Sequence, residues 1–333
     1  MLDAAAANGY TPGMQDMMGG FFGLELPEFN NFPFVESTNC ALLNSGRSAL
    51  ACILDNMPRP RRIFIPRFSC DTLREPLTNI PTTYYGCDET LTPLLPEDAG
   101  DDDCIILINY FGLTGKQLLT AAEQFPGQVI ADATTALFWK APEDIPVFYS
   151  LRKFVGVPDG GIACAPFPLT VLPEHTALSA DSALHLLQRL ESGIEKAASA
   201  AQKSEDSLCE KRLRMSPLTK KLLPSIDFER AARQRLENYG TLHRVLAELN
   251  RLPLPVIPDS APMCYPFVCG IPGLRDDLID AGIALPLYWP EVIDSTDSES
   301  AENKLTRTLL PLPLDQRYDR NDMQHLLRLI LLP

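Results

Sequence analysis

The feature that most constrains the fold of this 333-residue chain is a rhythm of short β-rich runs in its first half. The runs alternate with helical patterns such as 117–124, and their ends fall about 20 residues apart. They span residues 62–66, 83–87, 104–111, 129–132 and 146–150. Strands that alternate with helices at this pitch form a mainly parallel sheet covered by helices on both faces. We therefore expect an α/β protein whose functional side chains follow the carboxyl ends of the strands.

The second half of the chain predicts longer helices and fewer strands. Residues 177–204 and 228–249 each predict one long helix, because alanine, leucine and charged residues recur there with helical spacing. A short strand at 265–269, an acidic loop at 291–302 and a closing helix at 322–332 complete the pattern. We expect an N-terminal arm (1–35), a large domain (36–203) and a smaller α+β C-terminal domain (204–333).

Composition excludes several classes of function. The chain has 43 acidic and 29 basic residues, a net charge of −14, and such a surface repels the phosphates of a nucleic acid. No apolar run approaches the roughly 18–20 residues of a membrane span, and the N-terminus lacks a signal-peptide pattern. The nine cysteines form no CxxC pair and the four histidines no HxH or HxxxH pair. We therefore expect a reduced, cytoplasmic protein without a metal site.

The first candidate segment is 44–49, Asn-Ser-Gly-Arg-Ser-Ala, at the start of a predicted helix. Ser45 is a plausible N-cap, and the backbone N–H groups of the first turn favour a phosphate together with the helix dipole. Gly46 lets the backbone approach a ligand closely, and Arg47 adds positive charge. An ordinary capped helix is the competing interpretation.

Two further candidates, Asp132 and Lys153, follow consecutive predicted strands. A carboxylate directly after a buried strand serves either as a loop anchor or as the partner of a cationic ring nitrogen. Lys153 lies among apolar residues, where desolvation lowers the pKa of a lysine and makes it a usable nucleophile. A surface lysine is the competing interpretation, and the nearby Ser150 and Gly160-Gly161 pair make it less attractive.

The combination of these segments is more specific than any one of them. A phosphate cradle, a strand-end carboxylate and a strand-end lysine about 20 residues later are what pyridoxal phosphate (PLP) needs from a protein. The anion site holds the phosphate, the carboxylate faces the pyridine nitrogen, and the lysine attaches the cofactor covalently. The sequence therefore predicts a PLP site.

The chain also resembles a known family, the DegT/StrS-type sugar aminotransferases, which belong to fold type I of the PLP enzymes, the aspartate-aminotransferase fold. The matching segments occur in the family's order over most of the chain. They are the phosphate turn at 44–50, the strand end at 65–72, the short segment at 109–112, the aspartate segment at 132–135, the lysine loop at 150–161 and an element at 310–314.

The resemblance implies a role for each matching residue. Lys153 attaches the cofactor and moves protons during transamination, and Asp132 holds the protonated pyridine nitrogen. Gly46, Arg47 and Ser48 bind the phosphate through backbone and side chain.

Four positions add to this implied site or depart from the family pattern. Ser150 supplies a further hydroxyl to the phosphate. Cys70 stands where the family has an aromatic residue that stacks on the ring, and Thr135 where it has a glutamine that contacts the ring hydroxyl. Arg47 itself replaces the usual threonine.

The activity that the resemblance implies is transfer of an amino group, from glutamate, to a nucleotide-linked keto-sugar. It also implies a homodimer with shared active sites. Two alternatives stay open: a degenerate PLP-fold protein that binds without turnover, and a PLP-dependent sugar dehydratase or lyase. Tyr288 and Trp289 are an aromatic pair that either stacks on the substrate or packs in the core.

Overall fold

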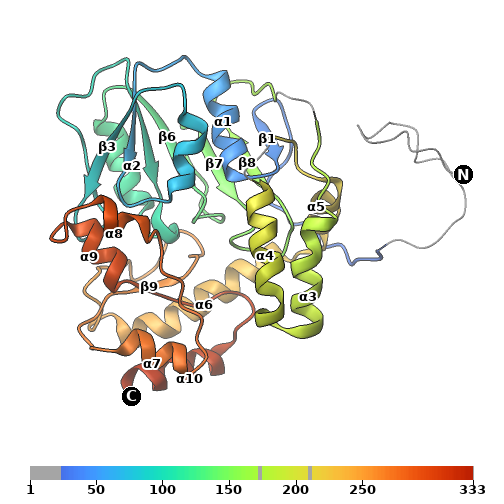
Figure 1. Cartoon of the computed structure of the whole chain (residues 1–333), viewed down its shortest axis with the longest axis vertical. Helices are drawn as coiled ribbons and strands as arrows, with labels where there is room; N and C mark the ends of the chain where they lie inside the picture. The colour runs from blue at the N-terminus through green and yellow to red at the C-terminus, as the bar shows by residue number, and fades with distance from the viewer. Residues whose placement is uncertain (1–23, 172–174, 209–211, 333) are drawn as a thin grey trace, which may run out of the picture.

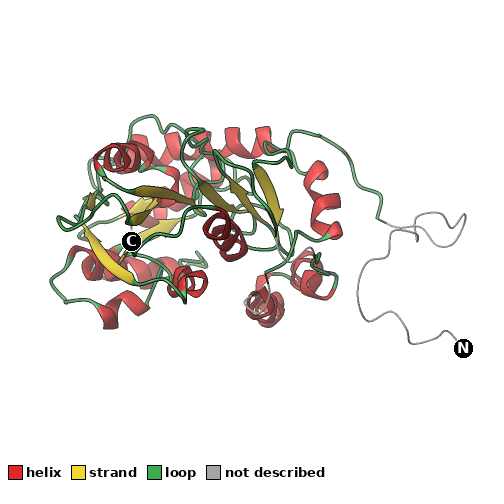
Figure 2. Ribbon diagram, turned by 90° about the horizontal axis from the view of Figure 1, so that it is seen from above, coloured by secondary structure: helices red, strands yellow, loops and turns green. Residues whose placement is uncertain are grey.

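The computed structural model describes residues 24–171, 175–208 and 212–332, and an eight-stranded sheet with helices on both faces forms its centre (Figures 1 and 2). The strand order is β1-β8-β7-β6-β5-β2-β3-β4, and β7, β6, β5, β2 and β3 run parallel. The strands are β1 Cys40–Leu43, β2 Ile63–Pro66, β3 Thr82–Cys87, β4 Pro93–Leu94, β5 Cys104–Ile108, β6 Gln128–Ala133, β7 Val147–Ser150 and β8 Gly161–Cys164. The predicted α/β fold is confirmed.

The central strand β5 shows why the sheet is covered on both faces. All five of its residues are buried, so it has no solvent-facing side. Ile105 and Leu107 pack into the core beneath α2 (Gly115–Gln124), whereas Cys104 and Ile106 pack into the core beneath α1 (Gly46–Asn56). The strand ends at Ile108, earlier than predicted, because the chain turns into a short 3-10 helix at Tyr110–Gly112.

Three strands of this sheet lie outside the predicted set: the two-residue β4, and the pair β1 and β8. β1 and β8 have only four residues each and include small side chains, so neither carries a β-rich signal. They pair antiparallel at one end of the sheet, and Gly161 lies so close to Ser45 that a Cβ there would overlap the Ser45 carbonyl oxygen. This close approach accounts for the second glycine of the Gly160-Gly161 pair.

The prediction of one long helix at 177–204 is wrong, because two helices stand there side by side (Figure 1). They are α3 (Leu184–Ser192) and α4 (Ile194–Leu208), which we call the α3–α4 hairpin. The chain reverses at Gly193, whose φ of 84° is left-handed backbone that glycine adopts easily. Composition alone does not distinguish such a hairpin from one helix, since both have the same helical spacing.

The last third of the chain packs around a long helix and a two-stranded sheet, in a second core that also includes Phe68, Tyr110 and Phe111. The acidic loop expected at 291–302 is partly helical, since it contains α8 and the start of α9. The domain boundaries stay a prediction. The elements are α5 Pro217–Leu222, α6 Phe228–Leu246, β9 Tyr265–Phe267, α7 Leu274–Asp280, α8 Glu291–Ser295, α9 Ala301–Thr308, β10 Leu310–Leu312 and α10 Arg320–Leu331.

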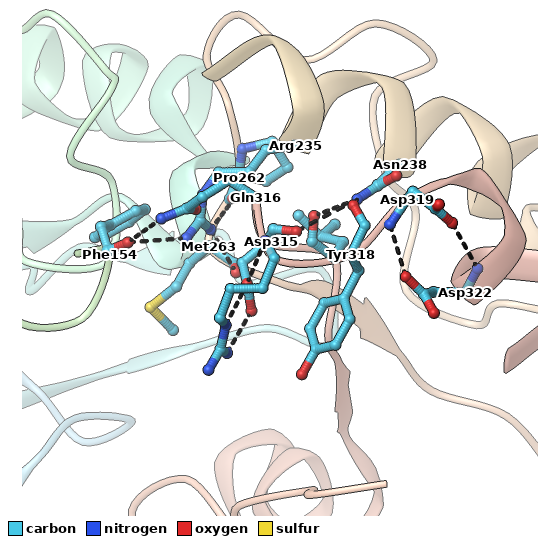
Figure 3. Close-up of polar contacts among 12 residues, drawn as sticks. Phe154, Arg235, Asn238, Pro262, Met263, Asp315, Gln316, Tyr318, Asp319 and Asp322 are labelled. Atoms are coloured by element: carbon cyan, nitrogen blue, oxygen red, sulfur yellow. Dashed lines mark hydrogen bonds and ion pairs between the residues drawn. The ribbon is translucent and has the colours of Figure 1, made fainter. Parts of the chain in front are cut away.

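A buried arginine of α6, Arg235, ties this core to the loop that follows β7 (Figure 3). Its side chain is only 2% exposed, and burial lowers its pKa to about 10. Its guanidinium donates to the carbonyls of Pro262 and Met263, both at 3.0 Å, and to that of Phe154 at 3.4 Å. Gln316 also donates to the Phe154 carbonyl, at 2.8 Å. The residue after Lys153 is therefore held by the C-terminal core.

We expect Arg235→Ala to lower the free energy of unfolding by about 3–4 kcal/mol, because buried carbonyls lose their donor and a cavity opens. Urea denaturation measures this. The control is Arg233→Ala, at an exposed position of the same helix, which should change stability by less than about 0.5 kcal/mol. Equal losses for the two variants would contradict the role of Arg235.

Candidate active site

A cavity of about 240 Å³ lies where the parallel strands β5, β6 and β7 end. The structure brings most of the predicted site residues to its wall. They are Gly46, Arg47, Cys70, Asp132, Thr135, Ser150 and Lys153. Ser48 is the exception, because it is buried behind the wall and its hydroxyl donates to Asn44 Oδ1 at 2.6 Å. The edge predicted from the strand rhythm is thus where the polar residues gather.

The N-terminus of α1 forms one side of the cavity. Ser45 caps this helix, as predicted, and its hydroxyl accepts from the Ser48 N–H at 3.2 Å. At Gly46 an added Cβ would stand 3.2 Å from Thr134 Cγ2 and 3.8 Å from Ser150 Cβ, so any larger residue would crowd the strand-end loops. The positive end of the helix dipole therefore faces the cavity beside the Ser150 hydroxyl, which is a favourable position for an anion.

Asp132 lies at the end of β6 and is almost fully buried. Its Oδ1 accepts from the Thr134 N–H at 2.8 Å, so it anchors the following turn while it also lines the cavity. Burial raises the pKa of Asp132, and the positive charge of Lys153 opposes that rise. A cation in the cavity would therefore stabilise the ionised carboxylate.

Lys153 lies beside this turn in the cavity wall. Its Nζ donates to Thr134 Oγ1 at 3.2 Å, so Thr134 joins the lysine to the turn that Asp132 anchors. The expectation of a desolvated lysine is wrong, because Lys153 is exposed where the cavity opens. The sequence-based prediction missed Thr134, although two threonines that follow the strand-end aspartate after one alanine were a usable signal.

Thr135 has its hydroxyl fully engaged with the backbone. The hydroxyl donates to the Asn109 carbonyl at 3.0 Å and accepts from the Phe111 N–H at 3.1 Å. Phe111 has a left-handed φ of 58°, so Thr135 stabilises a strained turn. Cys70 is half-buried, and its Sγ lies 2.7 Å from Thr72 Oγ1.

A charged cluster that the sequence analysis did not foresee lies beside the helix N-terminus. Arg47 forms ion pairs with Glu75 at 3.2 Å and with Glu205 at 3.3 Å. Arg152 also pairs with Glu205, and its Nε is buried without a partner among the described residues. Glu205 comes from α4, so the α3–α4 hairpin places a carboxylate on two arginines of the cavity wall.

Both residues of the aromatic pair pack in the core, and one of them also lines the cavity. Trp289 lines the cavity and meets Phe68 edge to face, with ring centroids 4.5 Å apart. Tyr288 packs against Phe111 at 5.6 Å, and burial raises the pKa of its hydroxyl. Both residues therefore pack in the core, where Trp289 is 9% exposed, and Trp289 also lines the cavity.

Within residues 24–171, 175–208 and 212–332, no three His, Cys, Asp or Glu side chains are grouped so as to hold a metal ion. In the same ranges no helix has the length and apolar character needed to cross a bilayer.

Comparison with known proteins identifies the fold. No protein-family model matches the chain, and no curated protein matches its sequence. Among solved structures, the sugar aminotransferase CalS13 from Micromonospora echinospora is 17% identical, covers 87% of this chain and 86% of its own, and has a TM-score of 0.60. A DegT DnrJ EryC1 StrS aminotransferase from Brucella abortus is 15% identical, with coverages of 87% and 84% and a TM-score of 0.56.

A third similar structure is GDP-4-keto-6-deoxymannose-3-dehydratase, which is 12% identical, with coverages of 87% and 87% and a TM-score of 0.56. The chain therefore has the fold of the type I PLP-dependent transferases. Within that class, the aminotransferase and dehydratase structures above share its architecture over most of its length. The fold that the motif resemblance implied is confirmed.

The raised pKa of Asp132 predicts a specific pH dependence of stability. The folded chain holds the Asp132 proton more tightly than the unfolded chain. The contribution of protonated Asp132 to the free energy of unfolding is therefore complete below its ordinary pKa of 3.8. The contribution is lost as the pH rises through the higher folded pKa. We expect Asp132→Asn, which keeps an acceptor for Thr134, to be more stable than the wild type at pH 7.

Urea denaturation of the cofactor-free protein between pH 3.5 and pH 7 measures this difference. The stability gain of Asp132→Asn should shrink towards the acid end of the range. Asp144→Asn, at an exposed position, is the control and should show no such trend. A gain that stays constant with pH would contradict the assignment.

Proposed function

We propose that the protein is a PLP-dependent aminotransferase that transfers an amino group, from glutamate, to a nucleotide-linked keto-sugar. One observation carries the proposal: Asp132, Lys153 and the N-terminus of α1 line the same cavity at the carboxyl edge of a type I sheet. The solved structures with this fold include aminotransferases and a dehydratase, and one of them, NtdA from Bacillus subtilis, has bound cofactor PMP.

The residues present fit PLP in its three essential contacts. The helix N-terminus with Gly46 and Ser150 offers an anion site, Asp132 is a buried carboxylate with one oxygen already fixed by Thr134, and Lys153 supplies a primary amine. Thr135 and Cys70 do not reproduce the side chains of the family at the ring. Thr135 instead supports the turn beneath the ring site, so its hydroxyl is not a ring contact.

The chemistry that PLP supplies when bound is an electron sink for bonds at the α-carbon of an amino acid. The protein residues do the rest. Asp132 stabilises a positive charge on the ring nitrogen, and its ionisation becomes less costly when that cation is present. Lys153 Nζ holds and moves the proton at the reacting carbon, while Thr134 Oγ1 orients the amine. Trp289 limits the access of water on one side.

The decisive experiment is an absorbance spectrum of the protein with PLP, before and after addition of glutamate. We expect an imine band that glutamate converts to the pyridoxamine form. A band that glutamate leaves unchanged would contradict glutamate as donor and favour the binding protein or a dehydratase. These two are then separated by testing release of water from a nucleotide-linked keto-sugar. No band at all would refute the PLP assignment.

Lys153→Ala should abolish the borohydride-reducible PLP adduct while leaving the protein folded, because Lys153 provides the only amine that lines the described part of the cavity. Mass spectrometry after reduction measures the adduct, and circular dichroism checks the fold. Lys140→Ala, at an exposed lysine away from the cavity, should keep the adduct. An adduct that persists in Lys153→Ala would refute the lysine assignment.

The charged cluster predicts that Glu205 competes with anions. Arg47 and Arg152 have a carboxylate against them, so a phosphate entering beside α1 must share or displace Glu205. We expect Glu205→Gln to tighten PLP binding by about fivefold, corresponding to about 1 kcal/mol for a half-exposed charge. Asp206→Asn on the same helix is the control and should leave the affinity unchanged. Weaker binding by Glu205→Gln would contradict the competition.

We further propose that two copies of the chain associate. The support is an apolar row on the α3–α4 hairpin, where α3 contributes no buried residue in the described part of the chain and Leu190 is 85% exposed. The other members of the row are Leu184, Leu187 and Ile194. Such a row is a typical interaction surface. Light scattering tests the proposal, and a monomeric mass at micromolar concentration would refute it.

A further inference from the structure

Two cysteines face each other across the antiparallel pair β1 and β8, away from the candidate active site. Cys40 stands directly opposite Cys164 in the register, and their sulfur atoms are 2.8 Å apart. We propose that Cys40 and Cys164 form a reversible disulfide, with a hydroperoxide as the oxidant. This modification site is independent of the proposed transamination.

The backbone hydrogen bonds between β1 and β8 leave room for a disulfide between Cys40 and Cys164. The Ala165 N–H donates to the Asn39 carbonyl at 3.0 Å, so the pair one step along, Cys40 and Cys164, is a non-hydrogen-bonded pair. Opposite residues of this kind have Cα atoms about 4.5 Å apart, and disulfides join Cα atoms about 4.4–6.8 Å apart. The backbone therefore needs no large movement for the bond to form.

A cavity beside the two cysteines offers a route for an oxidant. A cavity of about 710 Å³ has both cysteines in its wall, and Phe34, Trp139 and Tyr149 form part of its apolar lining. Cys164 is half-buried and Cys40 is 9% exposed. The pair differs in this respect from Cys52 and Cys104, which are buried in the core beneath α1.

The two thiols are suited to different roles in the reaction. The hydrogen bond from Cys164 lowers the pKa of the Cys40 thiol and raises that of Cys164. Cys40 as thiolate attacks the hydroperoxide, becomes a sulfenic acid and releases water or an alcohol. The Cys164 sulfur then attacks the sulfenic sulfur and releases water, so two thiols are oxidised by one hydroperoxide. A dithiol reductant reverses the reaction.

The disulfide would constrain β1, the strand that leads into the candidate active site. β1 continues directly through Asn44 to the helix cap Ser45, and β8 begins at Gly161, which lies against the same cap. β1 is the edge strand of the sheet and pairs there with β8. On its other side the Met215 N–H donates to the Leu42 carbonyl at 3.1 Å, and the Asn44 N–H donates to the Leu213 carbonyl at 2.9 Å. A disulfide would join these strands covalently, raise the unfolding temperature and reduce opening of β1.

The test uses the full chain without cofactor, treated with hydrogen peroxide and then alkylated in denaturant. Peptide mapping should find the peptides of Cys40 and Cys164 linked, with the loss of two hydrogen atoms, and dithiothreitol should separate them. The midpoint of thermal unfolding should rise by several degrees in the oxidised wild type. Cys164→Ser should show neither the linked peptide nor the rise, and Cys52→Ser should show both.

Because the mapping is done on the wild type, the proposal stays falsifiable even if a variant fails to fold. Full alkylation of both cysteines after peroxide treatment would overturn it, as would an equal rise of the midpoint in Cys164→Ser. None of these readouts depends on PLP binding, so failure here leaves the proposed activity untouched.

Discussion

The site depends on one close backbone approach, that of Gly161 to the carbonyl of Ser45. This contact lets β8 pass directly beneath the cap of α1, so that the helix begins beside the ends of β6 and β7. Gly46 continues the same packing against Thr134 and Ser150. A helix dipole loses its effect within about one turn. The dipole of α1 can therefore act on an anion in the cavity only because Gly161 and Gly46 have no side chain that would push the helix away.

The second organising element is a carboxylate that the fold buries at a cost. Asp132 ends a parallel strand, has one firm hydrogen bond and faces a cavity in which Lys153 supplies positive charge. Functional sites commonly keep such a group because its charge becomes favourable only when a ligand arrives. The surrounding ion pairs of Arg47, Arg152 and Glu205 keep the cavity nearly balanced in charge until then.

The sequence predicted the parts of the molecule whose signals are local. The parallel strands have apolar runs, Ser45 has a capping pattern, and Asp132 and Lys153 follow their strands directly. The parts that were missed depend on tertiary contact. β1 and β8 exist because they pair with each other, and Glu205 reaches Arg47 from 158 residues away. The α3–α4 hairpin, which turns at Gly193, has the composition expected of one continuous helix, so the turn was not predicted.

The hydrogen bonds of the buried Arg235 affect how cooperatively the chain unfolds. The C-terminal part provides the carbonyls of Pro262 and Met263, whereas the carbonyl of Phe154 comes from the loop after β7, so the full set of hydrogen bonds forms only when the two parts are packed together (Figure 3). Asn238, one turn further along α6, donates to the carbonyls of Leu314 and Tyr318 within the C-terminal part. The two cores are therefore coupled in free energy, and disorder that starts in one reaches the lysine loop of the other.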